Sequence, residues 1–71
     1  MIEMHYVDSS NIEAIGYDGD TQQLHVRFSK SGATYVYYSV EEWRFDEFQQ
    51  AESKGKYLNE NIKGAYDYSR L

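Results

Sequence analysis

The chain has 71 residues, no cysteine and no proline, and its 12 acidic and 7 basic residues give a net charge of −5. A chain of this length forms one domain that buries roughly 60% of the surface exposed when unfolded, and the missing cysteines exclude disulfides, thiolate metal sites and thiol nucleophiles. No secretory leader or membrane-spanning run is visible, so we expect a cytoplasmic domain without membrane contact, and its acidic balance disfavours a broad electrostatic grip on nucleic acid.

Three segments predict an antiparallel β-meander. Residues 11–17 form the first expected strand, and residues 18–21, Asp-Gly-Asp-Thr, are a turn signal because Asp caps turns and Gly accepts positive φ. Residues 24–28 alternate apolar and polar side chains, which is typical of a half-buried strand. A second turn over residues 29–32 leads to a third strand over residues 34–38, which holds three of the eight tyrosines.

Two helices are expected after the strands. Ser39 followed by Glu42 matches a capping box, which predicts a helix beginning there. The helix has an apolar stripe and a stop signal at Gly55; the stripe consists of Val40, Phe48 and Ala51, with Phe45 on its shoulder. A second short helix starts at residue 57 or 58, and its apolar face carries Leu58, Ile62 and either Ala65 or Tyr66. Residues 67–71 are expected to fray.

This order of elements predicts an α+β domain. The three-stranded antiparallel meander is followed by two short helices, which pack on one sheet face because each amphipathic helix must cover apolar surface. The other sheet face is then open to water or to a partner. A symmetric dimer through that face is one expected state, and a monomer is the other.

The register of the tyrosine strand has two alternatives, because side chains alternate between the faces of a sheet. If Phe28 lies across from Tyr35, then Tyr35 and Tyr37 join the core and Tyr38 faces outward. If Phe28 lies across from Thr34, then Val36 and Tyr38 face the core and the other two tyrosines are exposed. The residue pattern is compatible with both registers.

Spacings along most of the chain resemble those of the KTSC domain. These are Ser10-Asn11-Ile12, Ala14-Ile15-Gly16-Tyr17-Asp18, Leu24-x-Val26-x-Phe28, Gly32-x-x-Tyr35-x-Tyr37-x-x-Val40, Phe48-x-x-Ala51-x-Ser53-x-Gly55-x-Tyr57-x-Asn59, and Ile62. Glu41 departs from the pattern, because many members open the helix there with proline. The resemblance implies one domain over residues 1–71, with an ordered core over about residues 7–66.

The resemblance also bears on function. The family is named for the C-terminus of some lysyl-tRNA synthetases and also occurs as small bacterial or phage proteins, and its attachment to synthetases suggests RNA binding. Stacking on tyrosine combined with cationic contacts to phosphate would suit a single strand. The candidate residues are His25, Arg27 and Tyr38 on the open sheet face, and Lys54, Lys56 and Lys63 around the second helix; in the other register, Tyr35 and Tyr37 take the place of Tyr38. The structural alternative is that the tyrosines pack the core.

The first helix offers a rival interpretation. Trp43 lies off its apolar stripe, and tryptophan is enriched at interface hot spots. Together with Glu42, Asp46 and Glu47 it would present an acidic surface to a protein partner. That partner could be a nucleic-acid-binding host protein for which a phage-encoded chain acts as an inhibitor or decoy.

Catalysis, metal binding and cofactor binding find no support in the sequence. His5 and His25 lack the closely spaced additional ligands of a zinc site, and the turn at residues 18–21 lacks the later oxygen ligands of a calcium loop. No serine lies in a nucleophile elbow, and no glycine-rich phosphate loop precedes a helix. We therefore expect a non-enzymatic binding domain.

Overall fold

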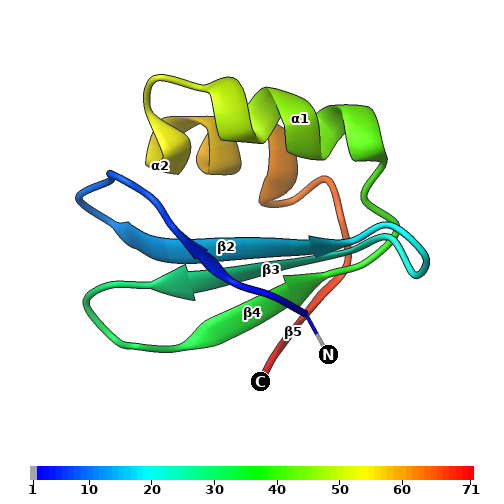
Figure 1. Ribbon diagram of the computed structural model, residues 1–71, viewed down its shortest axis with the longest axis horizontal. Helices are drawn as coiled ribbons and strands as arrows, with labels where there is room; N and C mark the ends of the chain where they lie inside the picture. Colours follow the sequence, from blue (N-terminus) through cyan, green and yellow to red (C-terminus); the bar gives the residue numbers. More distant parts are fainter. Residues whose placement is uncertain (1) are drawn as a thin grey trace.

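A five-stranded antiparallel sheet lies under one layer of helices in the computed structural model, which describes residues 2–71 (Figure 1). The strands follow chain order across the sheet. The elements are β1 (His5–Tyr6), β2 (Ile12–Asp18), β3 (Gln23–Phe28), β4 (Thr34–Tyr37), α1 (Glu42–Gln50), α2 (Lys54–Tyr57), the π-helical segment η1 (Leu58–Ile62) and β5 (Tyr68–Arg70). The α+β class and the meander of β2, β3 and β4 are confirmed, whereas a sheet of only three strands was wrong.

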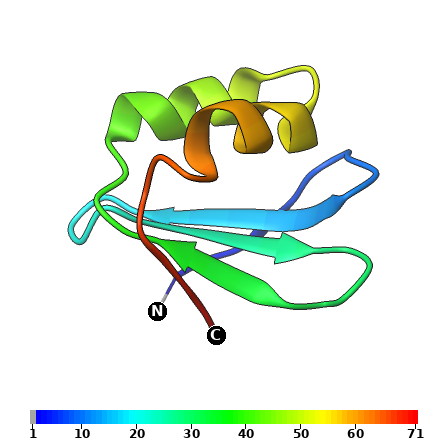
Figure 2. The same cartoon turned by 180° about the vertical axis from the view of Figure 1, so that it is seen from behind.

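The chain from residue 67 onward does not fray. Gly64 has a φ of +82°, a conformation that glycine adopts without strain, and it lies in the turn between η1 and the sheet. β5 then pairs with β4, with Tyr68 opposite Tyr37 and Arg70 opposite Tyr35. Figure 2 shows this C-terminal segment descending from the helical layer to lie beside β4. A three-residue edge strand is too short for its side-chain alternation to be recognised in the sequence.

The outer sheet face is partly covered by the N-terminal segment. An ideal Cβ at Gly16 would lie 2.6 Å from the Glu3 carbonyl oxygen and 2.8 Å from Ile2 Cγ2, so only glycine allows the segment to pass this closely. Ala14 and Val36 are buried, although they lie outside the main core cluster. The expectation that this face is open was therefore wrong for its central part.

The helix termini differ from the capping signals. α1 begins at Glu42 with Glu41 at the N-cap, where no side chain caps the helix, and Ser39 instead adopts a φ of +59°. This turn brings Val40 into the core, where its backbone N–H donates to the Gln22 carbonyl at 2.9 Å. The capping box was therefore wrong, because the connection from β4 to α1 is held by tertiary contacts.

Gly55 does not end the first helix. α1 ends at Gln50, and Gly55 lies inside α2, whose N-cap Ser53 accepts a hydrogen bond from the Lys56 backbone N–H at 3.3 Å. The second helix therefore starts earlier than residue 57 and continues into η1, whose Leu58 and Ile62 are buried as expected.

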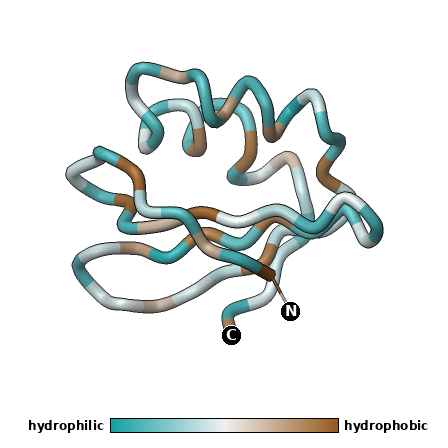
Figure 3. Tube along the Cα trace, in the orientation of Figure 1, coloured by the Kyte–Doolittle hydropathy of each residue, from teal (hydrophilic) through white to brown (hydrophobic). Residues whose placement is uncertain are grey.

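The main core lies between the helices and the sheet. It consists of Ile12, Ile15, Leu24, Val26, Tyr37, Val40, Phe48, Leu58 and Ile62. Phe48 is the buried residue that α1 contributes, and Ala51 is only half-buried. Most of the α1 tube is hydrophilic in Figure 3, in keeping with a helix that covers the core with a narrow face.

The register of β4 corresponds to neither alternative. Val26 lies across from Tyr35 and Leu24 across from Tyr37, which is a shift of two residues from the first alternative. A two-residue shift preserves the face, because side chains alternate with period two. Tyr35 and Tyr37 therefore point toward the helices, as the first alternative expects, and Tyr37 is buried.

Candidate functional site

A cleft rich in aromatic side chains opens at the β4–β5 edge of the helix-facing side of the sheet. It has a volume of about 520 Å³. We call it the aromatic cleft; its lining residues are Phe28, Ser31, Tyr35, Tyr37, Lys63, Gly64 and Tyr68. The cleft combines β3, β4 and β5 with the segment that follows η1, so it forms only when β5 joins the sheet.

The rings of the aromatic cleft support one another. Phe28 and Tyr35 meet edge to face with centroids 5.5 Å apart, and Tyr68 lies 5.7 Å from Tyr35 and 5.9 Å from Tyr37. Tyr37 is buried beneath the others, and this burial is the main cause that raises the pKa of its hydroxyl. Tyr68 is 59% exposed and offers a ring to an incoming planar group.

One cation contacts these rings, and a second lies on the same edge of the sheet. Lys63 Nζ lies 5.8 Å from the centroid of the Phe28 ring. Arg70 lies across from Tyr35, and directly opposed residues share a sheet face. Neither cation forms an ion pair within residues 2–71. Lys63 lines the cleft, whereas Arg70 lies outside its lining on the neighbouring edge strand.

A second hollow adjoins the aromatic cleft, with Phe28 and Lys63 in both linings. Its volume is about 230 Å³. We call it the polar hollow; its lining residues are Asn11, Ile12, Phe28, Lys30, Gly55, Leu58, Asn59 and Lys63.

We refer to the aromatic cleft and the polar hollow together as the joined clefts. Their linings contain no carboxylate, although the chain has an excess of acidic residues. Two other surface hollows do have carboxylates in their linings: Glu3, Asp18 and Asp20 in one, and Glu52 and Glu60 in the other. The charged residues in these linings are therefore Lys30 and Lys63 alone, both basic, in a protein of net charge −5.

The structure brings only one of the six expected nucleic-acid contacts to the joined clefts, namely Lys63. Lys54 Nζ donates to the Ala51 carbonyl at 2.8 Å, and Lys56 lies at the hollow that contains Glu52 and Glu60. These lysines therefore do not form one basic cluster.

The expected sheet-face contacts lie elsewhere too. Arg27 is on the outer face, where its Nε lies 2.7 Å from a Glu13 carboxylate oxygen and its guanidinium carbon lies 5.9 Å from the Tyr6 ring centroid. His25 shares that face, whereas Tyr38 is half-buried beyond the end of β4, and its N–H donates to the Asp67 carbonyl. The structure therefore does not assemble His25, Arg27 and Tyr38 into a stacking surface.

Sequence reasoning missed Tyr68, Arg70 and Phe28 as site residues. Phe28 entered the sequence analysis only as the register partner of the tyrosine strand and as part of the family spacing, and the other two lie in the segment that was expected to fray. The aromatic-polar-basic run of residues 68–70 is the available signal, but it acquires meaning only through its pairing with β4.

His25 predicts a pH dependence of stability. Its Nε2 is buried without a hydrogen-bond partner, and burial lowers the imidazole pKa from 6.5, against a smaller opposing effect of Asp18. The unfolded chain then binds more protons, so the free energy of unfolding should decrease as pH falls through about 6.5. Urea unfolding between about pH 8 and about pH 5 should show this loss, and His25→Gln should reduce it. An equal loss in the variant would contradict the assignment, and His5, which is exposed, provides the matched control in His5→Gln.

The outward face of α1 carries the expected protein-interaction residues. Trp43 is 51% exposed, with the Arg44 guanidinium carbon 4.4 Å from its ring centroid, and Glu42 and Asp46 are exposed. Glu47 differs from them, because its carboxylate accepts a 2.6 Å hydrogen bond from the Tyr57 hydroxyl. Three of the four residues therefore remain available on this face.

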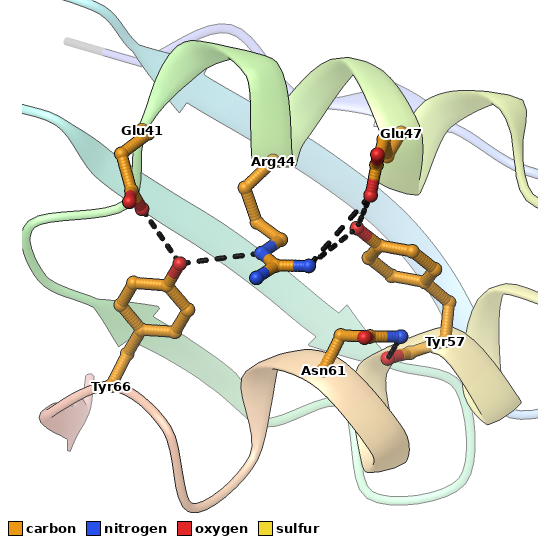
Figure 4. A network of polar contacts seen from close by, with 6 residues as sticks. All are labelled: Glu41, Arg44, Glu47, Tyr57, Asn61 and Tyr66. Atoms are coloured by element: carbon orange, nitrogen blue, oxygen red, sulfur yellow. Dashed lines mark hydrogen bonds and ion pairs between the residues drawn. The ribbon is translucent and has the colours of Figure 1, made fainter.

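Arg44 lies at the centre of a polar network that joins α1 to the later part of the chain (Figure 4). Its Nη1 donates to the Tyr57 hydroxyl at 3.2 Å and its Nε donates to the Tyr66 hydroxyl at 3.3 Å. Tyr66 in turn donates to Glu41 at 2.6 Å, which lowers the pKa of that carboxyl group. We call this set, with Glu47, the Arg44 network. It leaves the Arg44 charge engaged within the protein.

No group of three or more metal-ligating side chains occurs within residues 2–71. In the same part of the chain, no helix is long and apolar enough to cross a membrane.

Comparisons with known proteins agree with the spacings noted in the sequence. The family profile described as the KTSC domain matches residues 8–66. A protein from Tsukamurella paurometabola is 48% identical over 60 residues, which cover 84% of this chain and 88% of that protein. A lysine–tRNA ligase from Nostoc sp. is 38% identical over 64 residues, which cover 90% of this chain but only 11% of the ligase.

A solved structure shares the whole fold. The crystal structure of a KTSC domain protein from Yersinia pestis matches with a TM-score of 0.95 and 35% identity, over 100% of this chain and 99% of that one. The comparison of sequences and the comparison of structures thus identify the same family. The chain belongs to the KTSC domain family, which occurs both in small proteins and within lysine–tRNA ligases.

Proposed function

We propose that this protein is a non-enzymatic cytoplasmic domain that binds single-stranded RNA through the aromatic cleft. The observation that carries the proposal is the absence of carboxylates from the joined clefts of a chain with net charge −5, beside an exposed tyrosine ring and the Lys63 ammonium. The domain also occurs in lysine–tRNA ligases, whose name gives tRNA as a substrate. This occurrence supports RNA as the nucleic acid.

The chemistry of the cleft suits an unpaired base. Tyr68 can stack on a base of any identity, and such stacking is worth about 1–3 kcal/mol per base. Lys63 at one margin and Arg70 on the same sheet edge can contact flanking phosphates. Bases within a duplex are already stacked and paired, so a single strand is the ligand that this site can accept without unpairing.

The experiment is a titration of the isotope-labelled protein with a short mixed-sequence single-stranded RNA at several salt concentrations. Tyr68→Ala should weaken binding by about 1–3 kcal/mol, and Lys63→Ala should also reduce the salt slope by about 1. Lys56→Ala is the matched control, because it removes the same charge from an exposed site outside the joined clefts. The proposal fails if RNA shifts no amide signal at low salt, or if Lys56→Ala weakens binding as much as Lys63→Ala.

A second candidate is an acidic protein-interaction module, which includes an inhibitor or decoy of a nucleic-acid-binding protein. The exposed Trp43 beside Glu42 and Asp46 favours it. This candidate predicts that Trp43→Ala abolishes binding to a basic protein partner, whereas Tyr68→Ala and Lys63→Ala do not affect it.

A further inference from the structure

The polar hollow holds four hydrogen-bonding side chains without partners. They are the amides of Asn11 and Asn59 and the ammonium groups of Lys30 and Lys63. Within residues 2–71, none of these side chains forms a hydrogen bond or an ion pair. Elsewhere in the protein Arg27, Arg44 and Lys54 are engaged with protein oxygens. The four residues are exposed, so their donors are solvated and are not committed to another part of the protein.

The positive charge and the chemical type of these donors indicate which class of ligand fits the hollow. Two ammonium groups with no carboxylate in the lining favour an anion, and lysine binds phosphate as a point charge. The two amide groups add directional N–H donors. Ile12 and Leu58 are buried side chains of the same lining and form its apolar floor, whereas the lysines and asparagines belong to exposed residues at its solvent side.

Gly55 provides an independent observation at this hollow. It lies inside α2, where glycine is less stable than alanine by about 1 kcal/mol in general. An added Cβ would lie 3.3 Å from Asn11 Nδ2 and 3.8 Å from Asn11 Cβ. The missing side chain therefore leaves room for the Asn11 amide at the hollow, in a position where the helix alone would favour alanine.

We propose that the polar hollow is a phosphate subsite, which holds the phosphate of a nucleotide whose base stacks in the aromatic cleft. The inference rests on the proposed function and deepens it by assigning the two hollows to two parts of one ligand. Lys63 and Phe28 belong to both linings, so they mark the junction between base and phosphate. The ligand is thus an unpaired nucleotide with a phosphate on the Lys63 side of its base.

The test follows the side-chain amide signals of Asn11 and Asn59 and the backbone signal of Tyr68 by NMR. The three probes are uridine, uridine 5′-monophosphate and inorganic phosphate. Uridine should shift only Tyr68, inorganic phosphate only the two asparagines, and the nucleotide all three. The nucleotide should also bind more tightly than either of the other two probes.

Variants separate the subsite from the cleft. Asn59→Ala and Lys30→Ala should each weaken nucleotide binding about tenfold and leave uridine binding unchanged, because each removes one charge-assisted contact. Gly55→Ala should keep the fold and should also weaken nucleotide binding, because the added methyl group displaces the Asn11 side chain. Lys56→Ala again serves as the control for loss of charge.

Two results would overturn the inference. One is equal affinity for inorganic phosphate and the nucleotide, which would make the hollow a site for free anions. The other is unchanged nucleotide and RNA binding in Asn59→Ala and Lys30→Ala while Tyr68→Ala and Lys63→Ala weaken RNA binding. That second pattern would leave the proposed RNA binding intact and remove only the phosphate subsite. The proposed RNA binding through the aromatic cleft has its own failing outcomes, namely no amide shifts on titration with RNA, equal effects of Lys56→Ala and Lys63→Ala, or no effect of Tyr68→Ala and Lys63→Ala.

Discussion

Phe48→Ala is expected to lower the free energy of unfolding by about 3–5 kcal/mol. Phe48 is fully buried, is the buried residue that α1 contributes to the core, and stacks on Tyr57 at a centroid distance of 5.8 Å. A domain of this length has a total stability of about 4–11 kcal/mol. The substitution therefore removes a large share of the stability and weakens the docking of α1 on the sheet.

Urea unfolding measures this effect, and Phe45→Ala is the matched control. Phe45 is half-buried and stacks on Tyr17 with centroids 4.7 Å apart, so its removal exposes less apolar surface and leaves a smaller cavity. We expect a cost of about 1–2 kcal/mol. Equal costs for the two variants would show that α1 docks over a wider face than the structure indicates.

Arg44→Met is expected to cost about 2 kcal/mol, because it removes charge-assisted hydrogen bonds to two hydroxyl groups. The Arg44 side chain is only 22% exposed, so solvent screens these contacts incompletely. The variant leaves Tyr66 bonded to Glu41 and Tyr57 bonded to Glu47, which limits the loss. Methionine preserves much of the aliphatic packing.

The measurement combines urea unfolding with amide hydrogen exchange at Leu71, directly after β5. Tyr66 lies two residues before β5, so loosening it should speed exchange at Leu71, whose N–H donates to the Thr34 carbonyl at 2.8 Å. Tyr66→Phe tests one arm of the network, and a double-mutant cycle with Arg44→Met should give a coupling energy of at least about 0.5 kcal/mol. Additive effects would mean that the contact between the two side chains contributes no stability.

The central strands could be predicted because their signals are local. Residues 24–28 alternate in the way that is typical of a half-buried strand, and the turn at residues 18–21 contains its own hydrogen bond, from the Asp20 N–H to the Asp18 carboxylate at 3.0 Å. The two edge strands could not be predicted. β1 has two residues and β5 has three, and both depend on partners that are distant in the sequence.

Helix boundaries show the opposite case, in which a strong local signal was overridden. Ser39 and Glu42 have the spacing of a capping box, but the chain must first turn sharply so that Val40 can fill the core. Burial of a valine contributes more than a cap, roughly 1.5–3 kcal/mol against roughly 1 kcal/mol. Gly55 is a residue type that commonly ends helices, yet it lies within α2. The close approach of the Asn11 side chain, which an added Cβ would crowd, accounts for glycine at this position.

The sequence by itself determined the family, the antiparallel α+β class and most of the apolar core, because spacing and periodicity act over a few residues at a time. Only the tertiary structure decided where ligand chemistry can occur. The pairing of Tyr68 with Tyr37 creates the aromatic cleft, and the return of the chain after η1 places Lys63 beside Phe28. These contacts join residues far apart in the chain, so no local pattern encodes them.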